Sequence, residues 1–152
     1  MRGTRQWLVV VWMLCCCCVV QAKQLAVVTD PANPANNLSA AELVKIFNVR
    51  TLNWPDGRAI RLVLRDPSSA DMQLVLRNLW AMTSDQAQAF VQAHRGNIVI
   101  ASSDEAVLKF VGANRGAIGI VDLFSLTKDV KVLKIDGKLP VEQGYLLRGN
   151  SQ

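Results

Sequence analysis

The chain has little histidine and, after its first 22 residues, no cysteine. His94 is the single histidine among 152 residues, and all four cysteines, Cys15 to Cys18, lie in an apolar run near the N-terminus. Zinc sites use several His or Cys ligands, and a Ser-His-Asp triad would have to take His94 as its base. These scarcities argue against metalloenzymes and hydrolases, so the sequence predicts a non-enzyme with no cofactor and no metal.

The position of His94 also argues against a catalytic role. It follows Phe90 by four residues, near the end of an expected helix. The helix dipole favours a histidine at such a place. We therefore prefer a structural role for His94 over a role as general base.

Nucleotide-binding patterns and strong charge are also missing. The sequence has neither a phosphate loop nor a dinucleotide fingerprint. Its 17 basic and 12 acidic residues give a net charge of +5, which falls to about +3 without Arg2 and Arg5. Because this excess is mild and forms no basic block, we expect no nucleic-acid partner.

The N-terminus has the layout of a secretory signal. Arg2 and Arg5 precede an apolar run from Trp7 to Val20, and Val20-Gln21-Ala22 offers small residues to a signal peptidase. The run is shorter than the ~20 residues of a membrane span. The sequence thus predicts a signal peptide over 1–22, a domain over 23–152, a periplasmic or secreted location and no membrane span after cleavage. A retained N-terminal anchor is the alternative.

Strands alternate with helices along the rest of the chain, which predicts an α/β domain with a mixed sheet and about four flanking helices. Polar turns separate these elements, including Asp136-Gly137 and Trp54-Pro55-Asp56-Gly57. We expect strands over 25–29, 59–64, 97–101, 116–121 and 130–135, and a last strand or an irregular tail over 141–147. The capping-box spacing predicts four helix starts, at Ser39 with Glu42, Ser68 with Asp71, Thr83 with Gln86, and Ser102 with Glu105.

The segment from Arg65 to Asp71 is the candidate binding site. It joins the end of a strand to the start of a helix, where free N–H groups and the helix dipole attract anions. Ligands of open α/β sheets bind beyond the carboxyl ends of strands, and an arginine adds a charged, bidentate contact. The sequence therefore predicts an oxyanion site made of Arg65, Ser68, Ser69, Ala70 and Asp71. The alternative is purely structural, with Ser68 as an N-cap and Asp71 balancing the helix dipole.

Three segments carry a family resemblance. They are Leu38 to Phe47 (LSAAELVKIF), Asn53 to Gly57 (NWPDG) and Ala113 to Val121 (ANRGAIGIV). In order and spacing the chain resembles the phosphate-binding proteins of ABC transporters. The resemblance implies a periplasmic-binding-protein-like fold, phosphate or another small oxyanion as ligand, and a transporter or sensor as partner.

The same resemblance implies roles for individual residues. The family's phosphate motif is Arg-x-x-x-Ser-Gly-Thr, which Arg65 and Ser69 match, while Ala70 replaces the glycine and Asp71 the threonine. Asp71 would repel a nearby anion by about 4 kcal/mol at about 4 Å. Because the resemblance begins near the expected mature N-terminus, it implies a short member with a single lobe. A partner or self-association would complete the site; alternatively, the chain is an envelope interaction or sensory module without a ligand.

Overall fold

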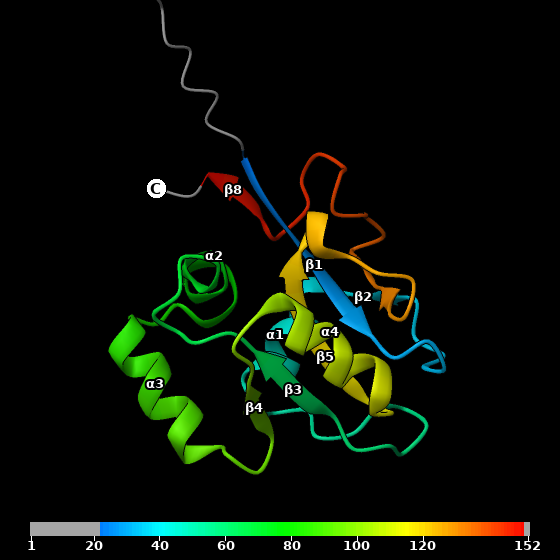
Figure 1. Ribbon diagram of the computed structural model, residues 1–152, viewed down its shortest axis with the longest axis horizontal. Helices are drawn as coiled ribbons and strands as arrows, with labels where there is room; N and C mark the ends of the chain where they lie inside the picture. The colour runs from blue at the N-terminus through cyan, green and yellow to red at the C-terminus, as the bar shows by residue number, and fades with distance from the viewer. Residues whose placement is uncertain (1–21, 151–152) are drawn as a thin grey trace, which may run out of the picture.

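One mixed sheet runs through the part of the chain that the computed structural model describes, residues 22–150 (Figure 1). The predicted signal peptide, apart from Ala22, lies outside these residues. The strand order is β4 (Ile98–Ile100), β3 (Arg61–Leu64), β5 (Ala117–Asp122), β1 (Ala22–Thr29) and β6 (Lys131–Val132), with β8 (Arg148–Asn150) beside the start of β1. β3 is parallel to β4 and β5, whereas β1 is antiparallel to β5, β6 and β8. The expected mixed α/β fold is confirmed.

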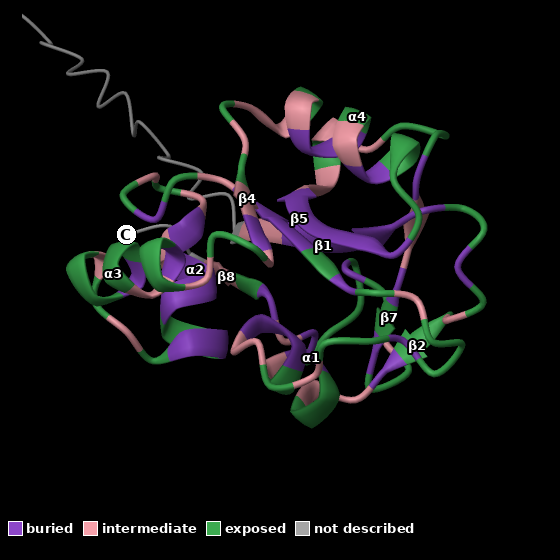
Figure 2. Cartoon of the chain, turned by 90° about the horizontal axis from the view of Figure 1, so that it is seen from below, coloured by how far each residue is buried: buried purple, intermediate pink, exposed green. Residues whose placement is uncertain are grey.

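Helices cover both faces of this sheet (Figure 2). α4 (Asp104–Ala113) packs on one face, and Gly119 of β5 lets it approach closely, because a Cβ there would lie 2.7 Å from Val107. The other face carries α1 (Ala40–Phe47), α2 (Met72–Val75) and a π-helix, η1 (Leu76–Trp80). α3 (Ser84–Ala93) follows η1, and a short parallel pair, β2 (Asn37–Leu38) with β7 (Lys134–Ile135), lies apart from the main sheet.

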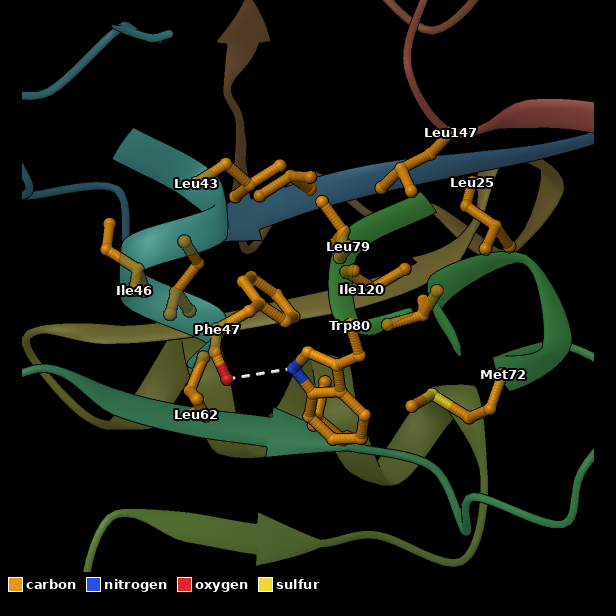
Figure 3. Close-up of a cluster of buried hydrophobic side chains, with 14 of the residues drawn as sticks. Leu25, Leu43, Ile46, Phe47, Leu62, Met72, Leu79, Trp80, Ile120 and Leu147 are labelled. Atoms are coloured by element: carbon orange, nitrogen blue, oxygen red, sulfur yellow. Dashed lines mark hydrogen bonds between the residues drawn. The ribbon is translucent and has the colours of Figure 1, made fainter. Parts of the chain in front are cut away.

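The strands alternate side chains between two hydrophobic clusters, as strand geometry requires. Leu25 and Val27 of β1 join the larger cluster under α1, whereas Ala26 and Val28 face α4. Figure 3 shows the larger cluster, where the indole Nε1 of Trp80 donates to the carbonyl oxygen of Phe47 over 2.9 Å. This bond ties η1 to the end of α1 inside an otherwise apolar core.

Short sequence patterns predicted many of these helices and strands. Capping boxes are present at Ser39 of α1 and Thr83 of α3, as expected. The expected 130–135 strand is split into β6 and β7, and 141–147 is an irregular tail. No helix in the described part of the chain is both long and apolar enough to span a bilayer.

Two predicted helix starts are wrong. α4 is capped by Ser103, whose hydroxyl accepts from the Ala106 N–H over 3.1 Å, and not by Ser102. The expected helix from Ser68 begins at Met72, and the Asp71 side chain makes no capping bond. The reason is Asp66, whose carboxylate accepts both the N–H and the hydroxyl of Ser68 and holds it in a turn.

Candidate functional site

Polar side chains gather where the parallel strands end, at an edge that we call the carboxyl edge. Arg65 follows β3, Asp104 begins α4 shortly after β4, and Asp122 ends β5. β1 runs the opposite way, so its beginning, with Lys23, lies at this edge as well. The edge therefore brings together charges from four separate segments of the chain.

Arg65 is held at the carboxyl edge by ion pairs. Its Nη1 lies 2.9 Å from Oδ1 of Asp104 and 3.8 Å from Oδ2 of Asp71. The second oxygen of Asp104 accepts the Asp122 N–H and the Ser125 hydroxyl, each over 3.0 Å. Asp104 thus connects β3, β5 and the 3₁₀-helix η2 (Leu123–Ser125).

Lys23 completes the charged cluster. Its ammonium pairs with Asp71 and lies 3.6 Å from Asp122. Burial alone would lower the pKa of Lys23, but the hydrogen bonds and charges of Asp71 and Asp122 together outweigh it and raise the pKa. The cluster therefore contains two cations, Lys23 and Arg65, and three carboxylates, Asp71, Asp104 and Asp122.

The turn between β3 and α2 holds the other predicted residues. The pKa of the Asp66 carboxyl is lowered by the hydrogen bonds from Ser68, so the Ser68 hydroxyl and N–H already have an acceptor. The Ser69 hydroxyl oxygen is buried and has no hydrogen-bond partner among the described residues. The N–H groups of Ala70 and Asp71 likewise donate to no acceptor in residues 22–150.

This arrangement retains donors for an anion but sets carboxylates beside them. Only Nη1 of Arg65 is used within residues 22–150, and a guanidinium has five N–H donors. The Ser69 hydroxyl and two backbone N–H groups lie on the turn that follows. An anion bound there would compete with Asp71 for the guanidinium.

The sequence prediction named Arg65 and the turn that follows it, but it did not name Lys23, Asp104, Asp122 or Ser125, which the structure places at the same edge. The usable signal was topological. Carboxyl ends of parallel strands share one edge, so the residues after every such strand were candidates, Asp104 among them. Lys23 could be placed at this edge only with the knowledge that β1 runs antiparallel to β5. No local sequence pattern indicates that direction.

His94 lies away from this edge. It caps the C-terminal end of α3, where its Nδ1 lies 2.8 Å from the Phe90 carbonyl oxygen and its ring packs on that of Phe90 at 4.2 Å between centroids. These contacts agree with the structural role that we preferred. Within residues 22–150, no group of three or more His, Cys, Asp or Glu side chains is placed to hold a metal ion.

Two hollows lie outside the charged cluster. A groove of about 720 Å³ runs between α4 and residues 125–129, and a smaller hollow of about 340 Å³ lies between α1 and the turn at Trp54. Neither is lined by any of the five predicted binding residues.

Comparisons with known proteins identify the fold. A family model described as "PBP superfamily domain" matches residues 19–145. An ABC-type phosphate transport receptor from Vibrio cholerae superposes with a TM-score of 0.73 at 21% identity, covering 86% of this chain and 55% of that one. PstS from Borrelia burgdorferi gives 0.70 at 21% identity, with 85% and 55% covered.

A third match is a phosphate-binding protein from Stenotrophomonas maltophilia, with a TM-score of 0.64 at 22% identity and coverage of 80% and 41%. The chain therefore spans about half the length of these structures. At such identities the likeness establishes the fold alone. The search of curated proteins gave no match.

Proposed function

The chain belongs to the PBP superfamily domain family, and from this membership we propose that it is an exported, non-catalytic binding domain that holds a small oxyanion at its carboxyl edge. Phosphate is the first candidate, because the structural relatives include a phosphate transport receptor and phosphate-binding proteins. In this proposal the domain delivers the anion to a transporter or reports it to a sensor.

Arg65 is the observation on which the proposal depends. Its guanidinium lies at the carboxyl edge with Nη1 on Asp104, and its other N–H groups have no acceptor among the described residues. Ser69 supplies an unpaired hydroxyl, and Ala70 and Asp71 supply unpaired N–H groups. We propose that these donors bind the oxyanion and that Ser68, fixed by Asp66, shapes the turn. A charged donor and several N–H groups are what oxyanion recognition needs.

Signal cleavage after Ala22 would improve the charge balance. It would leave a new α-ammonium on Lys23, whose side chain already lies among the carboxylates of the edge. That group, with an ordinary pKa of about 8, would add a third cation near neutral pH. N-terminal sequencing of the protein recovered from the periplasm or medium tests both export and the cleavage point.

Calorimetry with four matched proteins tests the site. Wild type, Arg65→Ala and Asp71→Thr are titrated with phosphate and with sulfate. We expect Arg65→Ala to abolish binding and Asp71→Thr to strengthen phosphate binding by tenfold or more, since about 1.4 kcal/mol of relieved repulsion suffices. Arg61→Ala is the control, because Arg61 begins the same strand at the opposite edge of the sheet. Equal affinities in all four proteins would refute the proposed site.

A second candidate is an envelope interaction or sensory module that keeps the fold without a ligand. The observation in its favour is that Arg65 and Lys23 already have carboxylate partners in Asp104 and Asp71. With three carboxylates and two cations, the cluster has a net negative charge, which disfavours the binding of a dianion. This candidate predicts no heat with millimolar phosphate or sulfate in the wild type, and no gain of binding in Asp71→Thr.

A further inference from the structure

The predicted cleavage point of the signal peptide lies inside a paired strand. Cleavage after Ala22 would break the bond between Ala22 and Lys23, which we call the scissile bond, and both residues belong to β1. β8 runs antiparallel beside them, with Ala22 opposite Asn150 and Lys23 opposite Gly149 (Figure 1). In the folded domain, the bond that a signal peptidase has to reach is therefore part of the sheet.

The main chain next to the scissile bond is engaged by β8. Hydrogen-bonded pairs recur at every second residue of an antiparallel ladder. The Leu25 N–H donates to the Leu147 carbonyl oxygen over 3.2 Å, so Lys23 and Gly149 are the next pair placed to exchange main-chain hydrogen bonds. A peptidase that binds its substrate as an extended strand uses these same main-chain groups. The peptidase and β8 therefore compete for one segment.

Packing holds both strands in this position. Leu147, which precedes β8, is fully buried, and Asn78 of η1 donates to the Leu146 carbonyl oxygen over 2.7 Å. In β1, the Lys23 ammonium pairs with Asp71 of the turn before α2. Exposure of the scissile bond therefore requires β8 and the tail before it to separate from the domain, which is a local unfolding event.

We propose that β8 controls signal cleavage: the scissile bond is cut while the C-terminal tail is undocked and is protected once β8 has paired with β1. Residues 22–24 precede β8 by most of the chain, so they are synthesised well before their partner. A chain that is cut in this interval is released, whereas a chain that folds first keeps the apolar run Trp7 to Val20. The inference rests on the exported, cleaved form of the proposed function, but not on the anion site.

The order of folding and cleavage tests this control. Full-length precursor made without membranes is unfolded in urea and diluted into detergent buffer, and purified signal peptidase is added at once or after folding is complete by circular dichroism. A peptide of residues 1–30, which lacks β8, reports the activity of the peptidase in both samples. We expect the folded precursor to be cleaved at least about tenfold more slowly, because cleavage of a folded segment follows the population of its open form.

Two proline substitutions in the tail assign the effect to β8. Gly149→Pro removes an N–H from the ladder, so the folded variant should be cleaved at least about tenfold faster than folded wild type. Gln143→Pro is the matched control. Gln143 precedes Gly144, which has φ +78°, in a turn closed by the Tyr145 N–H on the Glu142 carbonyl oxygen, and such a turn favours proline at that position. This variant should stay protected.

Each outcome separates this inference from the proposed function. Equal cleavage of folded and unfolded wild type overturns the control by β8 and leaves export intact. Cleavage of neither precursor nor peptide overturns both, because the chain then has no cleavable signal. Folded Gly149→Pro that stays protected places the block elsewhere and overturns the inference. If Gly149→Pro does not fold, Asn78→Ala replaces it: loss of its bond to the tail should speed cleavage of the folded precursor several-fold, and an unchanged rate overturns the inference.

Discussion

Arg65 and Asp104 form a 2.9 Å ion pair that joins the end of β3 to the first turn of α4. The pair lies 39 residues apart in sequence, and both side chains are mostly buried, at 24% and 15% exposure. Asp104 also accepts from Asp122 and Ser125. The position of the arginine at the candidate site is therefore set by the start of α4 as much as by the turn that follows β3.

Replacement of Asp104 tests this relationship. Asp104→Ala would leave the guanidinium, the Asp122 N–H and the Ser125 hydroxyl without their acceptor. Groups left unsatisfied in this way cost about 1–3 kcal/mol each when buried, so we expect a loss of about 2 kcal/mol or more in the free energy of unfolding, measured in urea. Asp85→Ala is the control, since Asp85 also lies in a first helical turn, in α3. Equal losses would contradict a special role for Asp104.

Two glycines with nearly the same backbone angle provide a second prediction. Gly57 has φ +88° and Gly116 has φ +85°, but a Cβ on Gly57 meets nothing within 4 Å, whereas one on Gly116 would lie 2.4 Å from the Ala59 carbonyl oxygen. The left-handed conformation alone costs a residue with a Cβ about 1–2 kcal/mol. We expect Gly57→Ala to lose about that much stability and Gly116→Ala at least twice as much.

Thermal unfolding of both alanine variants checks this difference. The Gly116 N–H and carbonyl oxygen are also bound, to Asp30 and to the indole of Trp54. A shift of the backbone to relieve the clash would weaken both bonds. Similar melting temperatures for the two variants would show that the segment can move aside freely.

Structure that is set by residues close together in the chain was predictable from the sequence, as α1 and α3 illustrate. Their capping boxes involve Ser39 with Glu42 and Thr83 with Gln86, so each signal is contained in four residues. The apolar residues Leu43, Ile46 and Phe47 recur at helical spacing in α1, and they are its buried residues. The turn at Asp136 and Gly137, both with positive φ, followed from residue type alone.

Structure that depends on contacts between residues far apart in the sequence was not predictable. Apolar residues recur at three- and four-residue intervals from Met72 to Trp80, a spacing typical of one continuous α-helix. The second half of this segment is nevertheless π-helical and ends with Ala81 in the left-handed region. There Trp80 bonds to Phe47, and the Leu79 carbonyl oxygen accepts from Asn48. Likewise, the ion pairs of the carboxyl edge connect segments that only the sheet topology brings together.

A comparison of two serines follows from the corrected helix start. The Ser39 hydroxyl accepts the Glu42 N–H at the start of α1, whereas Ser68 donates to Asp66 in an exposed turn and caps no helix. Loss of an N-cap costs about 1 kcal/mol, so Ser39→Ala should lower stability by about that amount. Ser68→Ala should cost a few tenths at most. Equal losses of stability in the two variants, measured by urea unfolding, would indicate that Ser68 does cap a helix.

The Glu42 side of the same capping box predicts a pH effect on α1. Hydrogen bonds from the N–H and side chain of Ser39 lower the pKa of the Glu42 carboxyl. A carboxyl with a lowered pKa in the folded state stabilises it above its ordinary pKa, and this stabilisation is lost as the pH falls through the folded value. NMR titration should therefore find the pKa of Glu42 below its ordinary value in wild type. In Ser39→Ala, which keeps the backbone N–H but loses the hydroxyl, the pKa should be less lowered. An identical pKa in the variant would show that the Ser39 hydroxyl does not contribute to the lowered pKa in solution.

Tyr145 predicts how the fold responds to alkali. Burial raises its pKa to about 12, against a smaller opposing interaction with the backbone of Val27. The unfolded chain should release this proton near its ordinary pKa of about 10, while the folded protein retains it. Stability should therefore be fully present below about pH 10 and decline up to about pH 12, by at most roughly 3 kcal/mol.

Tyr145→Phe separates this contribution from that of Lys23. The pKa of Lys23 is also raised, so its ion pairs add a loss of stability in the same direction at high pH. Apart from the backbone of Val27, the Tyr145 hydroxyl has no polar partner among the described residues, and the contact with Val27 does not reach hydrogen-bond geometry. Its removal should therefore cost little at neutral pH. The urea midpoints at about pH 8 and about pH 11.5 should differ less in Tyr145→Phe than in wild type. The difference that remains should shrink further when Lys23→Met is added to Tyr145→Phe. An identical pH dependence in wild type and Tyr145→Phe would mean that the ring becomes solvated before it ionises, and that the tail around residue 145 opens without unfolding the sheet.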